Sequence, residues 1–551
     1  MFFRIKQSGP RQYLQIVENS RAKGRVRQRV LTTLGRLDEL RQAGHLDGLL
    51  ASGARFAEHI LLITAHRNGQ VPTLTTQRIG PTLIFERLWQ ETGCQQIITQ
   101  LLGARYFEFP VERAILLTVL HRLCATGSDR ACQRWKEDYR IAGANEVELQ
   151  HLYRTMGWLG QQLPAKQQQG SSKLVPRCTK DLIEEQLFAR RRDLFSELDI
   201  VFFDTTSLYF EGAGGESLGQ YGHSKDHRPD LHQMIVGVVL DGDGRPICCE
   251  LWPGNTADVT TLLAVVDRLR QRFRIRRACI VADRGMISDD VVQELEDTGR
   301  PYILGARMRK QKEVRDQVLA DKGRFRVVNG PRKESTDPAP LKVKEVKVAG
   351  RRYVVCVNVE QVEHDRRQRE EIVTALREQL RQGDKSLVGN KGYRRYLKVE
   401  GASHFVIDEA NLREEARYDG TWVLRTNTEL STTDVALQYK KLWLVEQWFR
   451  SCKSLLETRP IYHHCDDTIR GHVFCSFLAL VLRQELQARL EARGHYFEWA
   501  DIIRDLERVQ YVKVVQDGRH YLLRSELQGT AGHVFQSVGV AVPPTVQEVA
   551  G

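Results

Sequence analysis

Two aspartates each follow directly on an apolar, strand-like segment. Asp204 ends "DIVFFD" (199–204), and Asp283 ends "ACIVAD" (278–283). Where strand ends cluster at one edge of a sheet, two such acids can lie side by side. Burying two carboxylates together costs free energy unless a cation neutralises them, and Mg²⁺ prefers a few carboxylates with water and phosphate oxygens. The pair therefore indicates a metal site, although either Asp alone is equally explained as a residue that caps a strand or a helix.

A third acid stands in the amphipathic stretch "YKKLWLVEQWFRSCK" (439–453). Residues three, four and seven apart share one face of a helix, so Tyr439, Glu446 and Lys453 fall on one stripe, with Arg450 beside it. Taken alone, the stretch is a helix with a Glu446–Arg450 ion pair, which contributes about 0.2–0.5 kcal/mol. Whether Glu446 belongs with the two aspartates depends on the elements around all three.

Those elements alternate between strand and helix patterns from residue 199 onward. The first strand is followed by a hairpin with "DGDG" at its turn, a helix, a strand, a second helix with Ser288 as its N-cap, and a final strand. Their residues are 199–204, 232–240, 245–252, 258–273, 278–283, a helix from 289, and 301–305. The order β-β-β-α-β-α-β predicts an α/β, ribonuclease-H-like core, in which helices pack over one mixed sheet.

The rest of the chain divides around this core. Strand alternation at 12–18 and 25–35 predicts a hairpin, and apolar residues at helical spacing fill 81–102 and 111–128. We expect six segments: a basic β-hairpin arm (1–35), a mainly helical N-terminal DNA-binding region (36–195), the first part of the core (196–305), a β-rich insertion (306–430), the second part of the core with Glu446 (431–490), and a small C-terminal module (491–551).

Composition limits the class of protein. The chain has 551 residues, of which 41% are hydrophobic and 28% charged, a globular balance that suggests about three or four domains. It has no apolar run of about 20 residues and no long apolar core near its start, so we expect a cytoplasmic protein without membrane spans. The net charge of +12 favours a polyanionic partner, most simply nucleic acid.

Cysteine and histidine give no separate metal site. The 11 cysteines are scattered without a CxxC pair, as expected of a reducing compartment. The stretch "HHCDD" (463–467) has metal-ligand types, but no second cluster follows at zinc spacing. We therefore interpret it as a polar loop.

Several motifs resemble those of bacterial insertion-sequence transposases of the DDE superfamily, in the branch with a β-rich insertion and a Tyr-x2-Arg-x3-Glu-x6-Lys signature. Tyr439, Glu446 and Lys453 stand at that spacing, whereas Leu442 occupies the Arg position. The segments that carry the resemblance are "FFDTTSLYFEG", "YGHSKDHRPDLHQ", "PGNTADVTTL", "VADRGM" and "VEQWFRSCKSLLETRPIYHH". They span about residues 200 to 475, and the N-terminal hairpin is also similar.

The resemblance implies a catalytic triad of Asp204, Asp283 and Glu446. These side chains would hold two Mg²⁺ ions, or Mn²⁺ as a substitute, about 3.5–4 Å apart, one activating the attacking oxygen and one stabilising the leaving oxygen. Water would first cleave the phosphodiester at the end of the element, and the 3′-OH would then attack the opposite strand or target DNA. No nucleotide cofactor is implied, and the chain contains no GxxxxGK[ST] loop.

The resemblance also implies DNA as the partner, through terminal inverted repeats and target sites, and a homodimer that pairs two ends in the bacterial cytoplasm, at the nucleoid. The implied contacts to phosphates or DNA ends are Tyr439, Arg450, Lys453, Lys225 and Arg228, and Arg450 is a candidate replacement for the missing signature Arg. Leu442 makes a hairpin intermediate less expected than strand cleavage.

Two further DNA contacts have equally good structural explanations. Trp422 resembles a tryptophan that stacks on a flipped base, which would stabilise the extruded base by about 1–3 kcal/mol, but it is also a typical core residue of a strand. Arg25 and Arg27 in the hairpin are either phosphate contacts or part of a solvated face. Two other functions stay open: a metal-dependent nuclease of the same fold that does not join DNA, and a non-catalytic DNA-binding relative.

Overall fold

The computed structural model describes residues 2–22, 25–46, 49, 75–103, 105–168, 175–191, 199–275, 278–334, 337–382, 394–400, 404–516 and 519–549. The chain forms two compact units. The first consists of Met1–Thr76, Tyr511–Glu526 and Pro543–Gly551, and the second of Gln77–Gln510 and Leu527–Val542. No helix in the described ranges is both long and apolar enough to span a bilayer.

The first unit contains antiparallel strands. β1 (Phe2–Ser8), β2 (Arg11–Ala22) and β3 (Arg25–Arg36) form a three-stranded sheet in that order, followed by α1 (Leu37–Gln42). The sequence predicted β2 and β3 but not β1, because β1 exposes nearly all of its side chains and so lacks the alternation of a half-buried strand. β16 (Gln510–Gln516), β17 (Arg519–Arg524) and β18 (Val546–Val549) pair antiparallel, and the chain passes from the first unit to the second within β4 (Thr75–Arg78).

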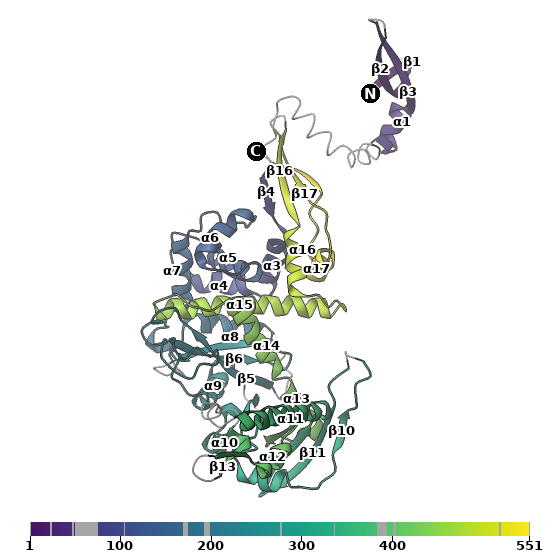
Figure 1. The fold of residues 1–551 in the computed structure, drawn as a ribbon. Coiled ribbons are helices and arrows are strands. Elements are labelled where there is room, and N and C mark those ends of the chain that lie inside the picture. The colour runs from purple at the N-terminus through teal and green to yellow at the C-terminus, as the bar shows by residue number, and fades with distance from the viewer. Residues whose placement is uncertain are drawn as a thin grey trace. The chain divides into compact units, whose positions relative to one another are not determined.

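The second unit is built on one nine-stranded sheet of order β10-β11-β12-β15-β9-β8-β5-β6-β7 (Figure 1). Its strands are β5 (Asp199–Tyr209), β6 (Gln233–Leu240), β7 (Pro246–Pro253), β8 (Ala278–Ala282), β9 (Tyr302–Gly305), β10 (Arg326–Asn329), β11 (Leu341–Val348), β12 (Arg351–Val357) and β15 (Thr421–Thr426). β8 pairs parallel with both β5 and β9, and the other neighbours are antiparallel. The molecule is therefore a mixed α/β protein with a large sheet.

The middle of this sheet follows the predicted order of elements. Along the chain, β5, β6 and β7 are followed by α9 (Asp258–Phe273), β8, α10 (Asp289–Asp297) and β9. Ser288 caps α10, since its Oγ accepts a hydrogen bond from the amide of Val291 at 3.2 Å. Phe203 and Leu262 belong to the apolar core between the sheet and α9. Because side chains alternate along a strand, Asp204 faces the opposite side of the sheet from Phe203.

Residues 306–430 add strands to the same sheet. β15 pairs with β9 and with β12, so β10, β11, β12 and β15 continue the core sheet on one side. This segment also contains α11 (Val359–Gln382), α12 (Glu409–Ala416), and the small hairpin of β13 (Leu397–Glu400) and β14 (His404–Ile407). The segment is therefore mixed: β10, β11, β12 and β15 belong to the core sheet, whereas β13 and β14 form a separate two-stranded sheet.

Helices cover the other end of the unit around α15 (Asp466–Glu491), which Figure 1 shows between a helical layer and the sheet. The layer comprises α3 (Gly80–Glu91), α4 (Cys94–Leu102), α5 (Val111–Cys124), α6 (Asp129–Trp135) and α7 (Leu149–Gly160), with α16 (Trp499–Glu507) and α17 (Ala531–Val538). On the other side of α15, α8 (Thr179–Arg191) packs on β7 and α9. The helical pattern at 81–102 breaks at Gly93, whose φ of +88° favours glycine. Gly160 and Gly471 let α7 and α15 approach closely, because a Cβ on either would collide with the other backbone.

Buried ion pairs join α8 to the sheet and α9. The Arg272 guanidinium lies 2.6 Å from a carboxylate oxygen of Glu184 and 2.7 Å from one of Glu250, and Lys180 Nζ lies 2.8 Å from Asp181 Oδ1. All of these side chains are almost fully buried. Removing one partner of such a pair typically costs about 3–5 kcal/mol, so the network fixes α8 firmly on the core.

Candidate active site

The two aspartates lie on neighbouring strands at the same level of the sheet. β5 and β8 pair in parallel register, with Phe203 opposite Ala282, and Asp204 and Asp283 are the next residues of the chain. Asp283 follows the end of β8 and precedes a short 3₁₀ turn, η3 (Arg284–Met286). The prediction that Asp204 ends its strand is wrong, because β5 continues to Tyr209 through its pairing with β6. Asp204 Oδ1 accepts a hydrogen bond from the Thr205 amide at 2.7 Å, and the parallel pairing brings the two carboxylates together.

The environment of Asp204 disfavours its charge. Burial raises the pKa of this carboxyl from 3.8 to about 6, and the nearby negative charges of Asp283 and Asp258 act in the same direction. The Lys225 ammonium and the Thr205 amide oppose the increase. A cation bound beside Asp204 would offset both its burial and the repulsion from Asp283 and Asp258.

Lys225 lies within this cluster. Its Nζ donates to the carbonyl oxygen and to Oγ1 of Thr205, both at 2.8 Å, and lies 2.9 Å from Asp258 Oδ2. Thr205 Oγ1 in turn donates to Asp258 Oδ1 at 2.7 Å. The three ammonium protons of Lys225 therefore have protein acceptors. Contact of Lys225 with DNA stays a prediction, and it would require a DNA phosphate to replace one of these acceptors. Thr205 and Asp258 were not singled out from the sequence, although Asp258 opens a predicted helix.

Tyr439 contacts the second aspartate directly. Its phenol donates a hydrogen bond to Asp283 Oδ1 at 3.0 Å. Burial and the charges of Asp283 and Asp204 raise the pKa of Tyr439, so the phenol stays protonated and acts as a donor. Gly305 at the end of β9 leaves room for the phenol, since a Cβ there would lie 2.5 Å from its oxygen. Tyr439 thus orients one oxygen of Asp283 and leaves the other available.

The sequence predicted one helix for the stretch that carries Glu446, but the structure divides this stretch among three elements. α13 (Thr432–Lys440) ends after Tyr439, α14 (Trp443–Arg450) begins three residues later, and a π-helical turn, η7 (Ser451–Leu455), follows. The break accompanies Leu442, whose side chain is 7% exposed at the position where the signature has an arginine.

α14 packs against β5 and β6 through Val445 and Phe449 and exposes Glu446 and Arg450. Across the described residues, no ion pair joins Glu446 to Arg450, so the surface pair considered for this stretch does not form. Glu446 also does not meet both aspartates. Within the described ranges, a group of three metal-ligating atoms within 4.8 Å of one another occurs at Asp129, His463 and His472 instead.

The donor set nevertheless fits a hard divalent cation. Asp204 and Asp283 offer carboxylate oxygens on neighbouring strands, and burial of Asp204, with Asp283 and Asp258 nearby, disfavours its charged form in the absence of a cation. Oxygen ligands of this kind suit Mg²⁺. Glu446 lies on a helix that contacts the strand of Asp204.

Two predicted phosphate contacts have acidic partners. Lys453 Nζ donates to Asp226 Oδ1 at 2.8 Å. Arg228 is exposed, pairs with Asp230 at 2.9 Å, and lies over the ring of Tyr209 at 5.6 Å. A role of either side chain in DNA binding stays a prediction, as does that of exposed Arg450.

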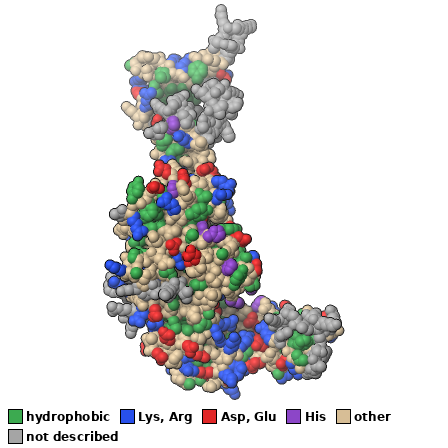
Figure 2. All heavy atoms as spheres, turned by 90° about the vertical axis from the view of Figure 1, so that its left-hand side faces the viewer, with side chains coloured by type: hydrophobic (Ala, Val, Ile, Leu, Met, Phe, Trp, Pro, Cys, Tyr) green, Lys and Arg blue, Asp and Glu red, His purple; other side chains and the backbone are tan. Residues whose placement is uncertain are grey.

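The other predicted contacts lie elsewhere. Trp422 is half-buried in β15 opposite Cys356, and its Nε1 has no hydrogen-bond acceptor among the described residues. Arg27 is exposed on β3 in the first unit, and Arg25 begins the same strand, with its side chain outside the described part of the structure. On the face in Figure 2, Lys and Arg side chains are interspersed with Asp and Glu, so the basic surplus is not gathered into one patch there.

His463, from the "HHCDD" stretch, lies in a buried cluster rather than in an isolated polar loop. Its Nε2 is 3.1 Å from His472 Nδ1 and 3.6 Å from Asp129 Oδ2. The Arg122 guanidinium also reaches His472 Nδ1, at 2.9 Å. The sequence could not reveal this cluster, because Asp129 and Arg122 are more than 300 positions away from His463.

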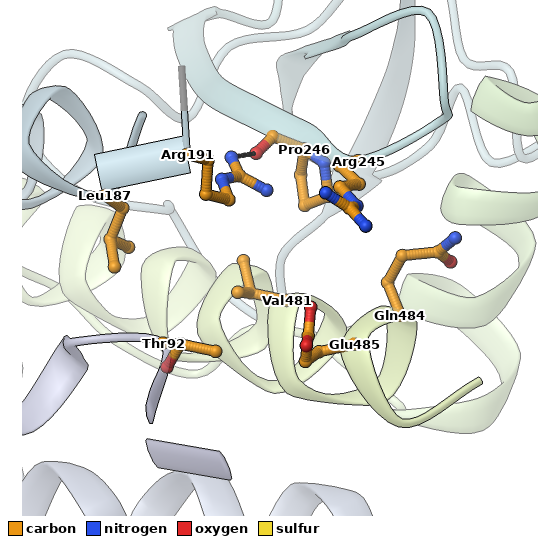
Figure 3. Close-up of a pocket in the computed structure, with 8 residues that line it drawn as sticks. All are labelled: Thr92, Leu187, Arg191, Arg245, Pro246, Val481, Gln484 and Glu485. Atoms are coloured by element: carbon orange, nitrogen blue, oxygen red, sulfur yellow. Dashed lines mark hydrogen bonds between the residues drawn. The ribbon is translucent and has the colours of Figure 1, made fainter. Parts of the chain in front are cut away.

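A small cavity lies away from the aspartates, between α8, the start of β7 and α15 (Figure 3). Its volume is about 20 Å³, and Arg191 Nη2 donates to the Pro246 carbonyl at 2.6 Å beside it. The lining residues are Thr92, Leu187, Arg191, Arg245, Pro246, Val481, Gln484 and Glu485. This volume suits a single water molecule, so the cavity is a packing feature rather than a substrate site.

Comparison with known families agrees with the motifs. A family model described as the transposase DDE domain matches residues 196–482, more than half of the chain. A model for the N-terminal domain of IS1634 family transposases matches residues 3–65. No curated protein matches the chain. The first match includes Asp204, Asp283 and Glu446 and the sheet edge at which the aspartates meet, and the resemblance to DDE transposases is confirmed. The chain therefore belongs to the insertion-sequence transposases that carry the transposase DDE domain.

Proposed function

We propose that the chain is a DNA transposase that binds the terminal inverted repeats of its own insertion sequence, cleaves the DNA at their ends by hydrolysis and joins the resulting 3′-OH to target DNA. The observation that carries the proposal is the pair of Asp204 and Asp283 on adjacent parallel strands, inside the segment that matches the transposase DDE domain. Glu446 is proposed as the third catalytic acid, because it lies on a helix that packs on the strand of Asp204.

The three acids would hold two Mg²⁺ ions, with Mn²⁺ as a substitute. When bound, the ions would neutralise the acids and stabilise charge on the attacking and leaving oxygens. The chain's own residues prepare this site. Tyr439 fixes one oxygen of Asp283, and Lys225 holds the segment that follows Asp204 through Thr205 and Asp258. The Tyr439 phenol restricts the rotamer of Asp283, and the Thr205 amide restricts that of Asp204, before the ions arrive.

DNA would approach the exposed side of α14. Arg450 is exposed one turn beyond Glu446 and is available to a phosphate that flanks the scissile bond. Trp422, Arg228 and the arm with Arg25 and Arg27 are proposed as further contacts. Pairing of two DNA ends before cleavage implies that the active species is a homodimer.

A strand-transfer assay with Mg²⁺ tests the proposal. The purified chain is incubated with labelled DNA that carries the inverted repeats flanking its gene and with a supercoiled target. Joined products support the transposase. Cleavage without joining indicates a nuclease of the same fold, and binding alone indicates a non-catalytic relative. Asp283→Asn should bind the same ends without cleaving them, and a cleaving Asp283→Asn chain would contradict the assignment of the acids.

A further inference from the structure

The loop between β5 and β6 contacts both sides of the candidate active site through two consecutive residues. Lys225 bonds to Thr205 and Asp258 on the side of Asp204. The next residue, Asp226, pairs with Lys453 in η7, the turn that directly continues the helix of Glu446. This dipeptide therefore joins the strand of the first acid to the helix of the third.

The contact at Asp226 has the burial expected of a structural anchor. The side chain of Asp226 is 7% exposed and that of Lys453 is 12% exposed. Asp226 Oδ2 also lies 3.4 Å from the Arg459 guanidinium, so one carboxylate meets two cations from the segment after α14. Partly desolvated, hydrogen-bonded ion pairs of this kind are short and directional.

α14 itself buries the apolar side chains Val445, Trp448 and Phe449, and apolar contacts are non-directional. Directional bonds flank the helix on both sides. Lys441 Nζ donates to the Gly242 carbonyl at 3.2 Å, and the Arg483 guanidinium donates to Ser451 Oγ at 2.8 Å. The bond at Lys453, about 10 Å along the helix from Glu446, adds a directional restraint toward the loop that holds Lys225.

We propose that Asp226 is a positioning residue for Glu446: its ion pair with Lys453, anchored by the neighbouring contacts of Lys225, sets the helix of Glu446 against the strand of Asp204. The inference rests on the proposed function, because it assumes that Glu446 completes the metal site. It also assigns Lys453 to an internal contact rather than to a DNA phosphate.

Single-turnover cleavage at saturating DNA, with Mg²⁺ varied, is the main test. Asp226→Asn keeps the shape of the side chain but removes its charge, and should slow cleavage by about 100-fold, as a displacement of about 1 Å can do. It should also raise the Mg²⁺ concentration needed for half-maximal rate. Binding of DNA ends should change by less than about 3-fold, as for a substitution away from the DNA.

Two comparisons separate positioning from a general loss of structure. Asp226→Glu restores the charge and should recover most of the rate. Asp226→Asn combined with Lys453→Met should be no slower than Lys453→Met alone, because both act through one contact. Asp230→Asn is the matched control, since Asp230 is an exposed acid in the same loop that pairs with exposed Arg228.

Several results would overturn the inference. One is a cleavage rate for Asp226→Asn within about 3-fold of that of the unsubstituted chain. Another is a loss of rate in Asp226→Glu equal to that in Asp226→Asn. A third is a double variant whose loss of rate is the product of the losses in the two single variants. If Asp226→Asn does not fold, Lys453→Met decides: loss of rate with end binding intact supports positioning, and parallel loss of end binding makes Lys453 a DNA contact instead.

Binding of Mn²⁺ to the DNA-free chain, followed by electron paramagnetic resonance, separates this inference from the proposed function. An unsubstituted chain that neither binds Mn²⁺ nor cleaves DNA contradicts the proposed function. If the unsubstituted chain binds Mn²⁺ and cleaves DNA, and Asp226→Asn has the same Mn²⁺ affinity and the same cleavage rate, only the positioning role of Asp226 is contradicted.

Discussion

Two clusters of potential metal ligands lie in the second unit, and they differ in their charge. At the sheet edge, Asp204 and Asp283 meet with Asp258 nearby, and Lys225 is the cation that most strongly affects Asp204. In the helical layer, His463 and His472 lie with Asp129 around a buried arginine. The first cluster has negative charge in excess, and the second does not.

Arg122 decides the chemistry of the histidine cluster. A guanidinium is only a donor, so His472 Nδ1 must accept its hydrogen bond, and His472 Nε2 then donates to the Thr458 carbonyl at 3.1 Å. Burial, together with the charge of Arg122, lowers the pKa of His463 to about 4 and that of His472 well below its usual value. Both rings are therefore neutral, and a cation already occupies the position that a metal would need. Ligand type and proximity alone do not define a metal site.

The largest expected effect separates the two clusters by activity. Asp204→Ala should reduce end cleavage by at least about 10³-fold, because several kcal/mol of transition-state stabilisation depend on the acids. His463→Ala should leave the single-turnover rate within about 3-fold of that of the unsubstituted chain. Gel-shift binding of DNA ends should survive both substitutions. Equal losses of cleavage rate in the two variants would contradict the prediction that only the aspartate cluster is catalytic.

Removing the Arg122 guanidinium should allow the histidine cluster to bind a metal ion. Arg122→Met leaves His472 Nδ1 without its strong donor and also removes the bond to the carbonyl of His472, so the free energy of unfolding should fall by about 2–4 kcal/mol. Zn²⁺ should then raise the melting temperature of Arg122→Met but not that of the unsubstituted chain. A variant that Zn²⁺ does not stabilise would show that the ligand geometry, and not Arg122, prevents binding.

The first cluster should destabilise the metal-free protein in a pH-dependent way. The pKa of Asp204 is about 6 in the folded chain and near 3.8 unfolded, so its contribution to stability is fully present below pH 3.8 and is lost as pH rises through 6. Asp204→Asn should therefore stabilise the metal-free chain at pH 8 by roughly 2–3 kcal/mol and have little effect at pH 4. Thermal melting at both pH values measures this. Destabilisation at pH 8 would mean that the acids do not repel one another.

The smallest expected effect concerns an exposed arginine, in contrast to buried Arg122. Arg450→Ala should leave stability unchanged, weaken end binding by less than about tenfold and reduce the salt slope of log Kd by about 1, as loss of one phosphate contact does. Competition binding between 50 and 200 mM salt would measure the slope. An unchanged slope with intact cleavage would exclude Arg450 as the substitute for the missing signature arginine.

Local patterns in the sequence were sufficient for the core elements and for the aspartates. The helix predicted at 258–273 is α9, and Asp283 follows the strand that was expected to precede it. These features depend on residues close together in the chain. The strand of Asp204 was also predicted, but pairing with β6 carries it five residues beyond Asp204, which the local pattern did not indicate. The family was identified from the same motifs.

The tertiary structure decided the rest, because it depended on partners far apart in the sequence. The helix that periodicity predicted through Tyr439 and Glu446 is broken between α13 and α14, where Leu442 is buried. Pairing of β15 with β9 extends the core sheet, and Asp226 meets Lys453 across 227 positions. Which charges neutralise one another is set by such long-range contacts, and a residue's type and local spacing do not encode them. The sequence by itself determined the acids and their strands, and the fold alone determined which cations face them.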